Sequence, residues 1–225
     1  TTTAANGEAA TFGFEIVDDT GTPVTAFDEL HTRPLHLIVL SRNMVDYLHL
    51  HPTMDDRGHW TVELPPLSPG SYRVFADFQP TGSANLTLGA DVFVPGDPPA
   101  VTIPEPSTVT TADGYTVTMD GTPATGSSEL SFTVEVDGKV VQTEPYLGAA
   151  GHLVAIRNGD LAYLHVHPHD GGTSAVVFTA EIPSAGTYRL FFDYSHNGTV
   201  RTASFTVDVA TGSAADTMTT HQEGH

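Results

Sequence analysis

Tyr47-Leu48-His49-Leu50-His51-Pro52 is a segment in the first half of this 225-residue sequence in which histidine alternates with an apolar residue before a proline. The second half repeats the pattern as Tyr163-Leu164-His165-Val166-His167-Pro168. Each is preceded, at the same distance, by an apolar run that carries one histidine: Leu35-His36-Leu37-Ile38-Val39-Leu40 in the first half and Gly151-His152-Leu153-Val154-Ala155-Ile156 in the second. The agreement resumes after a variable loop, in a Gly-Ser/Thr-Tyr-Arg segment. The chain is therefore an internal duplication that carries His-x12-His-x-His-Pro twice.

The sequence around these repeats is typical of short β-strands. Runs rich in Val, Thr, Phe, Tyr and Leu recur every 8 to 15 residues between Gly, Pro, Asp and Asn clusters, and no stretch keeps a helical period. This predicts an all-β chain of two tandem immunoglobulin-like β-sandwich (Greek-key) domains. The expected strands are residues 10–17, 35–41, 45–51, 59–64, 71–78 and 86–94 in the first half, and 114–119, 130–136, 139–143, 151–157, 161–167, 175–182, 187–194 and 200–209 in the second.

The Pro-rich stretch between the halves predicts the domain boundary. We assign residues 9–96 to the first sandwich, 97–109 to an extended linker, 110–210 to the second sandwich and 211–225 to a disordered tail.

Composition excludes several classes of function. Twenty-seven acidic residues against 8 basic ones give a formal charge of −19, which repels nucleic acid and anionic lipid and attracts cations, although solubility alone is enough to explain it. No apolar run approaches the roughly 18 residues of a membrane span, so we expect no membrane insertion. The chain has no cysteine, which excludes disulfides and thiolate chemistry. A start at Thr1-Thr2-Thr3 in place of Met favours a processed protein, secreted or extracytoplasmic.

The Asn158-Gly159 dipeptide predicts how the second pair of histidine-bearing strands meets. Asn-Gly between apolar runs is the strongest short signal for a two-residue type I′ hairpin, which would set His152 directly opposite His165. His167, two residues farther, would share their face. Opposed side chains have Cβ atoms about 5 Å apart, so three imidazoles can converge on one point.

The first repeat predicts an equivalent patch by alignment. His36, His49 and His51 correspond to the second set, although Arg42-Asn43 replaces Asn-Gly in the turn. Imidazole is the commonest metal ligand. All-imidazole sites suit Cu(II), Zn and Ni, with copper bound most tightly, so we expect a copper ion, with zinc as the alternative. The alternative interpretation is that these are solvated surface histidines kept by shared ancestry.

Several residues are candidates for a fourth ligand. Asp77 and Asp193 occupy matched positions on a later strand and could either ligate the metal or orient an imidazole. The other candidates are His169 and His196 in loops of the second repeat, and Met44 and Met54 as thioether ligands of Cu(I).

At the HxHP strands the sequence resembles secreted, largely actinobacterial proteins in which a His-Leu-x-Val segment precedes Tyr/Phe-x-His-x-His-Pro. It is also similar to the immunoglobulin-like domains found around periplasmic copper handling. The resemblance covers most of both repeats and implies a metal-related role. Cu/Zn superoxide dismutase and the cupins fit less well: the first has cysteines and a later metal loop, and the second need a Glu where this chain has Asp55 or Asp170.

These observations support three hypotheses. The leading one is an extracytoplasmic metal-binding protein that sequesters or delivers copper through both histidine sets. The second is a structural or adhesive module that associates with itself or a protein partner through a pH-responsive histidine patch. The third is a metal-dependent oxidoreductase. It ranks last because no substrate pocket can be argued from the sequence, and no catalytic residue is assigned.

Overall fold

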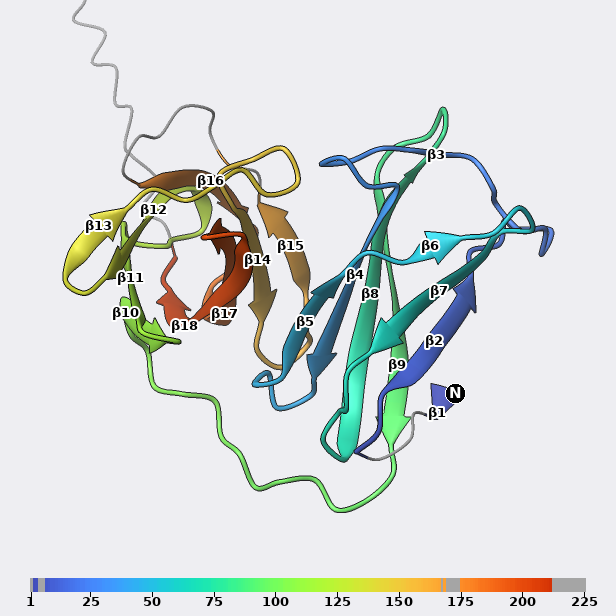
Figure 1. The fold of residues 1–225 in the computed structure, drawn as a ribbon, viewed down its shortest axis with the longest axis horizontal. Coiled ribbons are helices and arrows are strands. Elements are labelled where there is room, and N and C mark those ends of the chain that lie inside the picture. The colour runs from blue at the N-terminus through green and yellow to red at the C-terminus, as the bar shows by residue number, and fades with distance from the viewer. Residues whose placement is uncertain (1, 4–6, 167, 169–174, 212–225) are drawn as a thin grey trace, which may run out of the picture. The chain divides into compact units, whose positions relative to one another are not determined.

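The computed structural model describes residues 2–3, 7–166, 168 and 175–211, and only the backbone of residues 2, 3 and 165. Every regular element in this part of the chain is a β-strand (Figure 1). The strands form four sheets that build two β-sandwiches, with antiparallel pairing apart from the parallel contact of β1 with β9. The predicted tandem immunoglobulin-like architecture is confirmed. Within the same residues there is no helix long and apolar enough to cross a membrane.

Nine strands of the described residues form the first sandwich. They are β1 (Thr2–Thr3), β2 (Ala10–Glu15), β3 (Phe27–Asp28), β4 (Leu35–Ser41), β5 (Tyr47–Leu50), β6 (Thr53–Met54), β7 (His59–Leu64), β8 (Gly70–Pro80) and β9 (Leu86–Val94). One sheet has the order β1-β9-β8-β4-β5, with β3 on the end of β8, and the other has the order β2-β7-β6.

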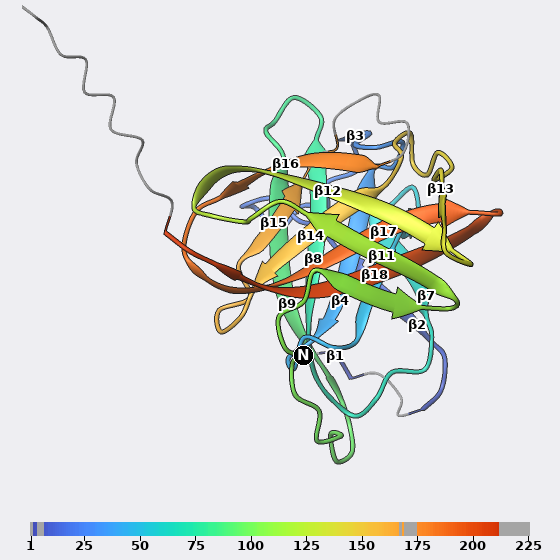
Figure 2. The same ribbon diagram turned by 90° about the vertical axis from the view of Figure 1, so that its left-hand side faces the viewer.

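The second sandwich repeats this plan. Its strands are β10 (Val109–Ala112), β11 (Tyr115–Asp120), β12 (Gly126–Val136), β13 (Lys139–Val141), β14 (His152–Arg157), β15 (Tyr163–Val166), β16 (Val176–Ile182), β17 (Gly186–His196) and β18 (Thr199–Val209). The sheet β10-β11-β12-β13, with β16 on β12, can be followed in Figure 2, and the other sheet has the order β15-β14-β17-β18.

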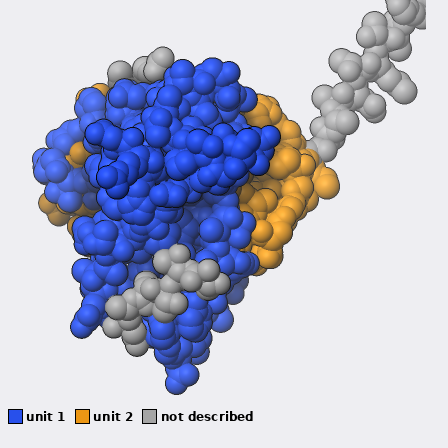
Figure 3. Space-filling view, turned by 90° about the vertical axis from the view of Figure 1, so that its right-hand side faces the viewer, with its two compact units in different colours: residues 1–105, 144–151, 197–200 blue, residues 106–143, 152–196, 201–225 orange. Residues whose placement is uncertain are grey.

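The residues group into two compact units by their internal contacts (Figure 3). The first unit comprises residues 1–105, 144–151 and 197–200, and the second comprises 106–143, 152–196 and 201–225.

The strands predicted from alternation are all present, with ends within two residues of expectation except at β12. β12 begins four residues early because Gly126-Ser127-Ser128-Glu129, a segment of weak strand propensity, is paired with β16. The strands β1, β3, β6 and β10 were not predicted, because two to four residues are too few to show a period.

Alternate residues of β4 build the core of the first sandwich. Leu35, Leu37 and Val39 are buried in one cluster with Trp60 and Phe78. His36 and Ile38 lie on the other face of the strand and are also fully buried. β4 is therefore enclosed on both sides.

A tyrosine closes the same corner in both repeats. The Tyr72 hydroxyl donates to the carbonyl of Ser68 at 2.9 Å, and the Tyr188 hydroxyl donates to the carbonyl of Ser184 at 2.9 Å. This hydrogen bond to the backbone four residues upstream is the tyrosine corner of immunoglobulin-like domains. Burial, together with the nearby Asp46 carboxylate, raises the pKa of Tyr72 to about 12.

Candidate metal centre

The three histidines of the first repeat lie on the β4–β5 hairpin. His36 is the second residue of β4, His49 is in β5, and His51 follows directly after the last residue of that strand. Leu48 and Leu50 pack against the core, as predicted, so alternation turns the histidines to the opposite face. Pro52 follows His51 and has no N–H for the ladder, which accounts for the end of β5 before it.

The predicted pairing of the two histidine strands is wrong by two residues in the second repeat. His165 lies opposite Val154, whereas the sequence placed it opposite His152. The connection is a four-residue loop in which the Leu161 N–H donates to the Arg157 carbonyl at 3.1 Å and the Arg157 N–H donates to Ala162 at 3.0 Å. The Asn-Gly signal for a two-residue turn is therefore overruled.

An ion pair accompanies this longer loop. The Asp160 carboxylate accepts from the Arg157 guanidinium and from the Ala162 N–H at 3.2 Å. The hydrogen bond with Arg157 holds the pKa of Asp160 at about 2. Asp160 thus folds back on the loop, where the two-residue turn would have placed it in the strand.

The first repeat has the same register, with Ile38 opposite His49 and Leu37 opposite Leu50. The next position along this ladder sets His36 across from His51. Because side chains alternate with a period of two, a shift of two residues changes partners and preserves faces. In the first repeat, the prediction that the histidines share a face therefore survives the error in register.

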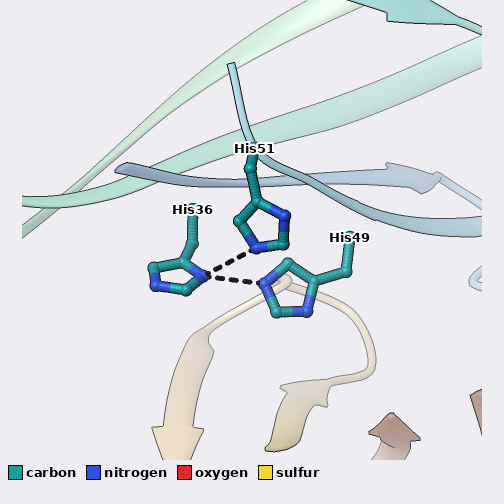
Figure 4. Close-up of side chains that lie close together, drawn as sticks. All are labelled: His36, His49 and His51. Atoms are coloured by element: carbon teal, nitrogen blue, oxygen red, sulfur yellow. Dashed lines mark hydrogen bonds between the residues drawn. The ribbon is translucent and has the colours of Figure 1, made fainter. Parts of the chain in front are cut away.

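The structure brings His36, His49 and His51 together (Figure 4). The Nδ1 atom of His36 lies 3.0 Å from Nε2 of His49 and 3.2 Å from Nε2 of His51, and the three nitrogens all lie within 4.8 Å of one another. Nitrogens bound to one tetrahedral zinc at 2.0–2.1 Å are about 3.3 Å apart. His36, His49 and His51 could therefore hold a metal ion after small side-chain adjustments.

A backbone carbonyl sets the protonation of His36. Its Nε2 lies 2.8 Å from the carbonyl oxygen of Leu30, which can only accept a hydrogen bond. Nε2 therefore carries a hydrogen, and in the neutral ring Nδ1 presents its lone pair to the other two histidines. Metal-ligating histidines are oriented in this way by a carbonyl or carboxylate on the opposite nitrogen.

The turn that supplies this carbonyl was not predicted to belong to the site. Leu30 pairs with Arg33 around His31 and Thr32, both of which have positive φ angles, 49° and 64°. The His31 ring lies 6.0 Å from the His36 ring, between centroids. A main-chain acceptor has no signature in a sequence. The one signal in this turn was His31, a further histidine close to His36 in the chain.

Asp77, a candidate fourth ligand or orienting residue, lies on the strand next to His36. It is paired with His36 across β4 and β8 and is buried, yet it does not belong to the group of converging ligand atoms. Its carboxylate accepts from the Asn85 amide at 3.0 Å and from the Thr87 hydroxyl at 3.4 Å. The Leu30 carbonyl is the acceptor that faces Nε2 of His36.

The methionines differ in their relation to the cluster. Met44 is buried in the β4–β5 turn, where its N–H donates to Ser41, at the end of the hairpin remote from His36. Met54 lines a pocket together with His51.

The second repeat is described only in part. His152 is fully buried at the start of β14 and pairs with Asp193, whose carboxylate accepts from Thr202 at 2.5 Å. The His165 side chain, His167, His169 and the tail from residue 212 lie outside the described residues. His196 contacts Tyr115, with 2.8 Å between Nδ1 and the hydroxyl.

A family model described as a domain of unknown function, DUF8832, matches residues 1–92 and 109–211. The two matched segments correspond to the two repeats. No curated protein is significantly similar in sequence.

Solved structures with a similar fold include tandem β-sandwich modules. A chimeric titin Z1Z2 tandem is 11% identical over 94% of this chain and 95% of its own, with a TM-score of 0.25. Fibronectin(III)-like modules of Clostridium thermocellum CbhA are 10% identical over 100% of this chain and 95% of theirs, with a TM-score of 0.25. A DUF4426 family protein from Pseudomonas aeruginosa is 12% identical over 48% of this chain and 100% of its own, with a TM-score of 0.38. These similarities concern fold alone.

Proposed function

The chain belongs to the DUF8832 family of domains of unknown function, and we propose that it is an extracytoplasmic metal-binding protein that sequesters or delivers copper, with zinc as the alternative ion. The metal lies between His36, His49 and His51 in the first repeat.

The observation that carries this proposal is the orientation of His36. Its Nε2 hydrogen is committed to Leu30, so its Nδ1 lone pair faces the Nε2 atoms of His49 and His51 at 3.0 and 3.2 Å. His36 is fully buried while its two partners are partly exposed, which leaves a path by which an ion can enter and leave. Three protein nitrogens leave a fourth position open for a water or an exchanging ligand.

The ligand set favours copper. Imidazole nitrogens bind divalent copper more tightly than zinc. The chain has no cysteine to compete for or reduce the ion, which suits Cu(II) in an oxidising compartment outside the cytoplasm. The negative charge of −19 attracts cations.

Duplication supports a second site at His152, His165 and His167. The backbone register of β14 and β15 is the same as that of β4 and β5, and His152 is buried like His36. We propose that this second set binds the same ion.

Calorimetric titration of the metal-free chain with Cu(II) and Zn(II) tests the proposal. We expect about two ions per chain, and about one after His49→Ala/His51→Ala. Loss of two ligands should weaken the first site more than about 100-fold, since loss of an outer partner alone weakens metal sites 10- to 100-fold. His165→Ala/His167→Ala should remove the other ion.

His59→Ala is the matched control. His59 is an exposed histidine of the same sandwich, near Glu15 at 3.8 Å and outside the cluster. The His59→Ala variant should bind metal with the same stoichiometry and affinity as the unaltered chain. Absence of binding, or binding indifferent to loss of His49 and His51, would overturn the proposal.

A further inference from the structure

A pocket of about 410 Å³ lies beside the histidine cluster in the first unit. Its lining includes Phe27, Arg33, His51, Met54 and Trp60. His51 is common to the pocket and the cluster. A molecule in this pocket would therefore contact one of the three converging imidazoles.

The pocket follows from the way the chain leaves the β5 strand. After Pro52 the chain enters β6, where Met54 pairs with Trp60 of β7. Phe27 comes from β3, which pairs with the end of β8, and Arg33 comes from the turn whose Leu30 carbonyl orients His36. The Leu30–Arg33 turn and the chain just after β5 therefore contribute to both the histidine cluster and the pocket.

The apolar part of the pocket is aromatic. Trp60 is fully buried and stacks on Phe14, with centroids 6.2 Å apart and planes 9° apart. Phe27 meets the Trp60 ring edge-on, at 5.2 Å and 74°. Met54 packs against the same core. These residues form a rigid wall suited to an apolar or aromatic body.

The donors of the lining that remain uncommitted among the described residues include the Trp60 indole N–H and the Arg33 guanidinium. Trp60 Nε1 is buried and has no acceptor there. Arg33 is exposed and forms no ion pair within the same residues, although acidic groups outnumber basic ones 27 to 8. By contrast, Arg42 and Arg73 both contact Asp91. The exposed Arg33 guanidinium can therefore pair with an acceptor that carries negative charge.

We propose that this pocket binds a small carboxylate with an apolar or aromatic body. The Arg33 guanidinium pairs with the carboxylate, which it can hold with two parallel hydrogen bonds. The body packs against the partly exposed Phe27 and Met54, behind which the buried Trp60 ring lies. This part of the proposal stands without a metal.

The position of His51 adds a second part, which rests on the proposed function. A carboxylate oxygen is a common ligand of zinc and copper. A carboxylate held beside His51 can take the open fourth position of the metal. The bound ion then carries a small organic acid as its last ligand, and each stabilises the other.

Trp60 provides the measurement, because it is the single tryptophan of the chain. The metal-free full chain is titrated with phenylacetate while tryptophan fluorescence is recorded. We expect a saturable change, absent with the uncharged phenylacetamide. Arg33→Gln should raise Kd about tenfold, as expected for loss of a charge-assisted pair. Arg57→Gln, which removes an exposed arginine outside the lining, should leave Kd unchanged.

Three results would overturn the pocket. The first is the absence of a saturable signal up to about 10 mM phenylacetate, since a Kd above this would be too weak for a specific site of this kind. The second is an equal response to phenylacetamide. The third is an equal Kd in Arg33→Gln and Arg57→Gln. Calorimetric zinc binding by the same preparation keeps this failure separate from that of the metal centre. Zinc binding without phenylacetate binding removes the pocket alone, and the reverse removes the metal centre alone.

Zinc saturation tests the second part. Zinc should tighten phenylacetate binding at least about fivefold, a usual size for coupled sites. His49→Ala should abolish this effect while keeping binding in the metal-free form, since His49 does not line the pocket. An affinity unchanged by zinc would show that the carboxylate is not a metal ligand.

Discussion

The Nε2 atom of His36 lies 2.8 Å from the carbonyl oxygen of Leu30, and this contact decides which nitrogen of His36 faces the other two histidines. The carbonyl is held in place by the Leu30–Arg33 turn, in which two residues other than glycine adopt positive φ angles. The second repeat forms the same turn between Tyr146 and Ala149, with Leu147 and Gly148 at its centre.

Thr32→Gly should stabilise the chain. Thr32 has a φ of 64°, where a β-branched residue is strained by about 1–2 kcal/mol, and the matching residue of the second repeat is already Gly148. We expect the free energy of unfolding to rise by about 1 kcal/mol in urea denaturation, with metal affinity unchanged. Gly148→Thr should lower it by a similar amount. If Thr32→Gly does not raise the free energy of unfolding, Thr32 does not keep its positive φ angle in solution.

Metal should protect the folded chain against heat. An ion that binds the folded state alone stabilises it by about 2.7 kcal/mol at a free concentration of 100 Kd. Differential scanning calorimetry should show a higher Tm with Zn(II), reversed by a chelator. His49→Ala/His51→Ala should lose the part of the shift due to the first repeat. An equal shift in that variant would place the bound ion elsewhere.

Alkaline pH should destabilise the protein. Burial is the main cause that raises the pKa of Tyr72 and of Tyr194 from 10.0 to about 12. Between these values the folded chain holds protons that the unfolded chain has released, so stability present below pH 10 is lost as the pH rises to about 12. Urea midpoints measured across this range check the prediction.

Tyr72→Phe separates the two tyrosines in that experiment. This variant should lose about 1 kcal/mol at neutral pH, because the hydrogen bond to Ser68 disappears. It should also show a shallower alkaline decline. An identical decline would assign the whole effect to other groups.

Truncation of a buried core leucine should destabilise the chain far more than truncation of an exposed leucine. Leu37 is 1% exposed within the core of the first sandwich, so Leu37→Ala should lower the free energy of unfolding by about 2–5 kcal/mol. Leu88 on β9 is 51% exposed, and Leu88→Ala should change it by less than about 0.5 kcal/mol. Similar losses in both variants, by chemical denaturation, would contradict this placement.

Alternation in the sequence was sufficient to locate the strands other than the short β1, β3, β6 and β10, and to put Leu48 and Leu50 on the core face. The pairing of strands was not, because it depends on the length of a loop. Asn158-Gly159 indicated two residues, but Asp160 binds Arg157 and the loop has four.

The candidate site divides in the same way. His36, His49 and His51 could be found from their spacing, because histidine residues can be read directly from a sequence. The Leu30 carbonyl could not, because every residue has one and only the folded turn shows which is used. The pocket was also invisible, since Arg33, Met54 and Trp60 converge through turns and short strands without a periodic pattern.

The pairing of β4 with β5 also bears on how this hairpin can evolve. A turn that gains or loses two residues re-pairs the strands and leaves every side chain on its original face. A single inserted residue would carry the histidines of one strand into the hydrophobic interior and bring leucines out in their place. Descendants of the duplication can therefore vary this turn in steps of two, and we expect natural variation in its length to be even.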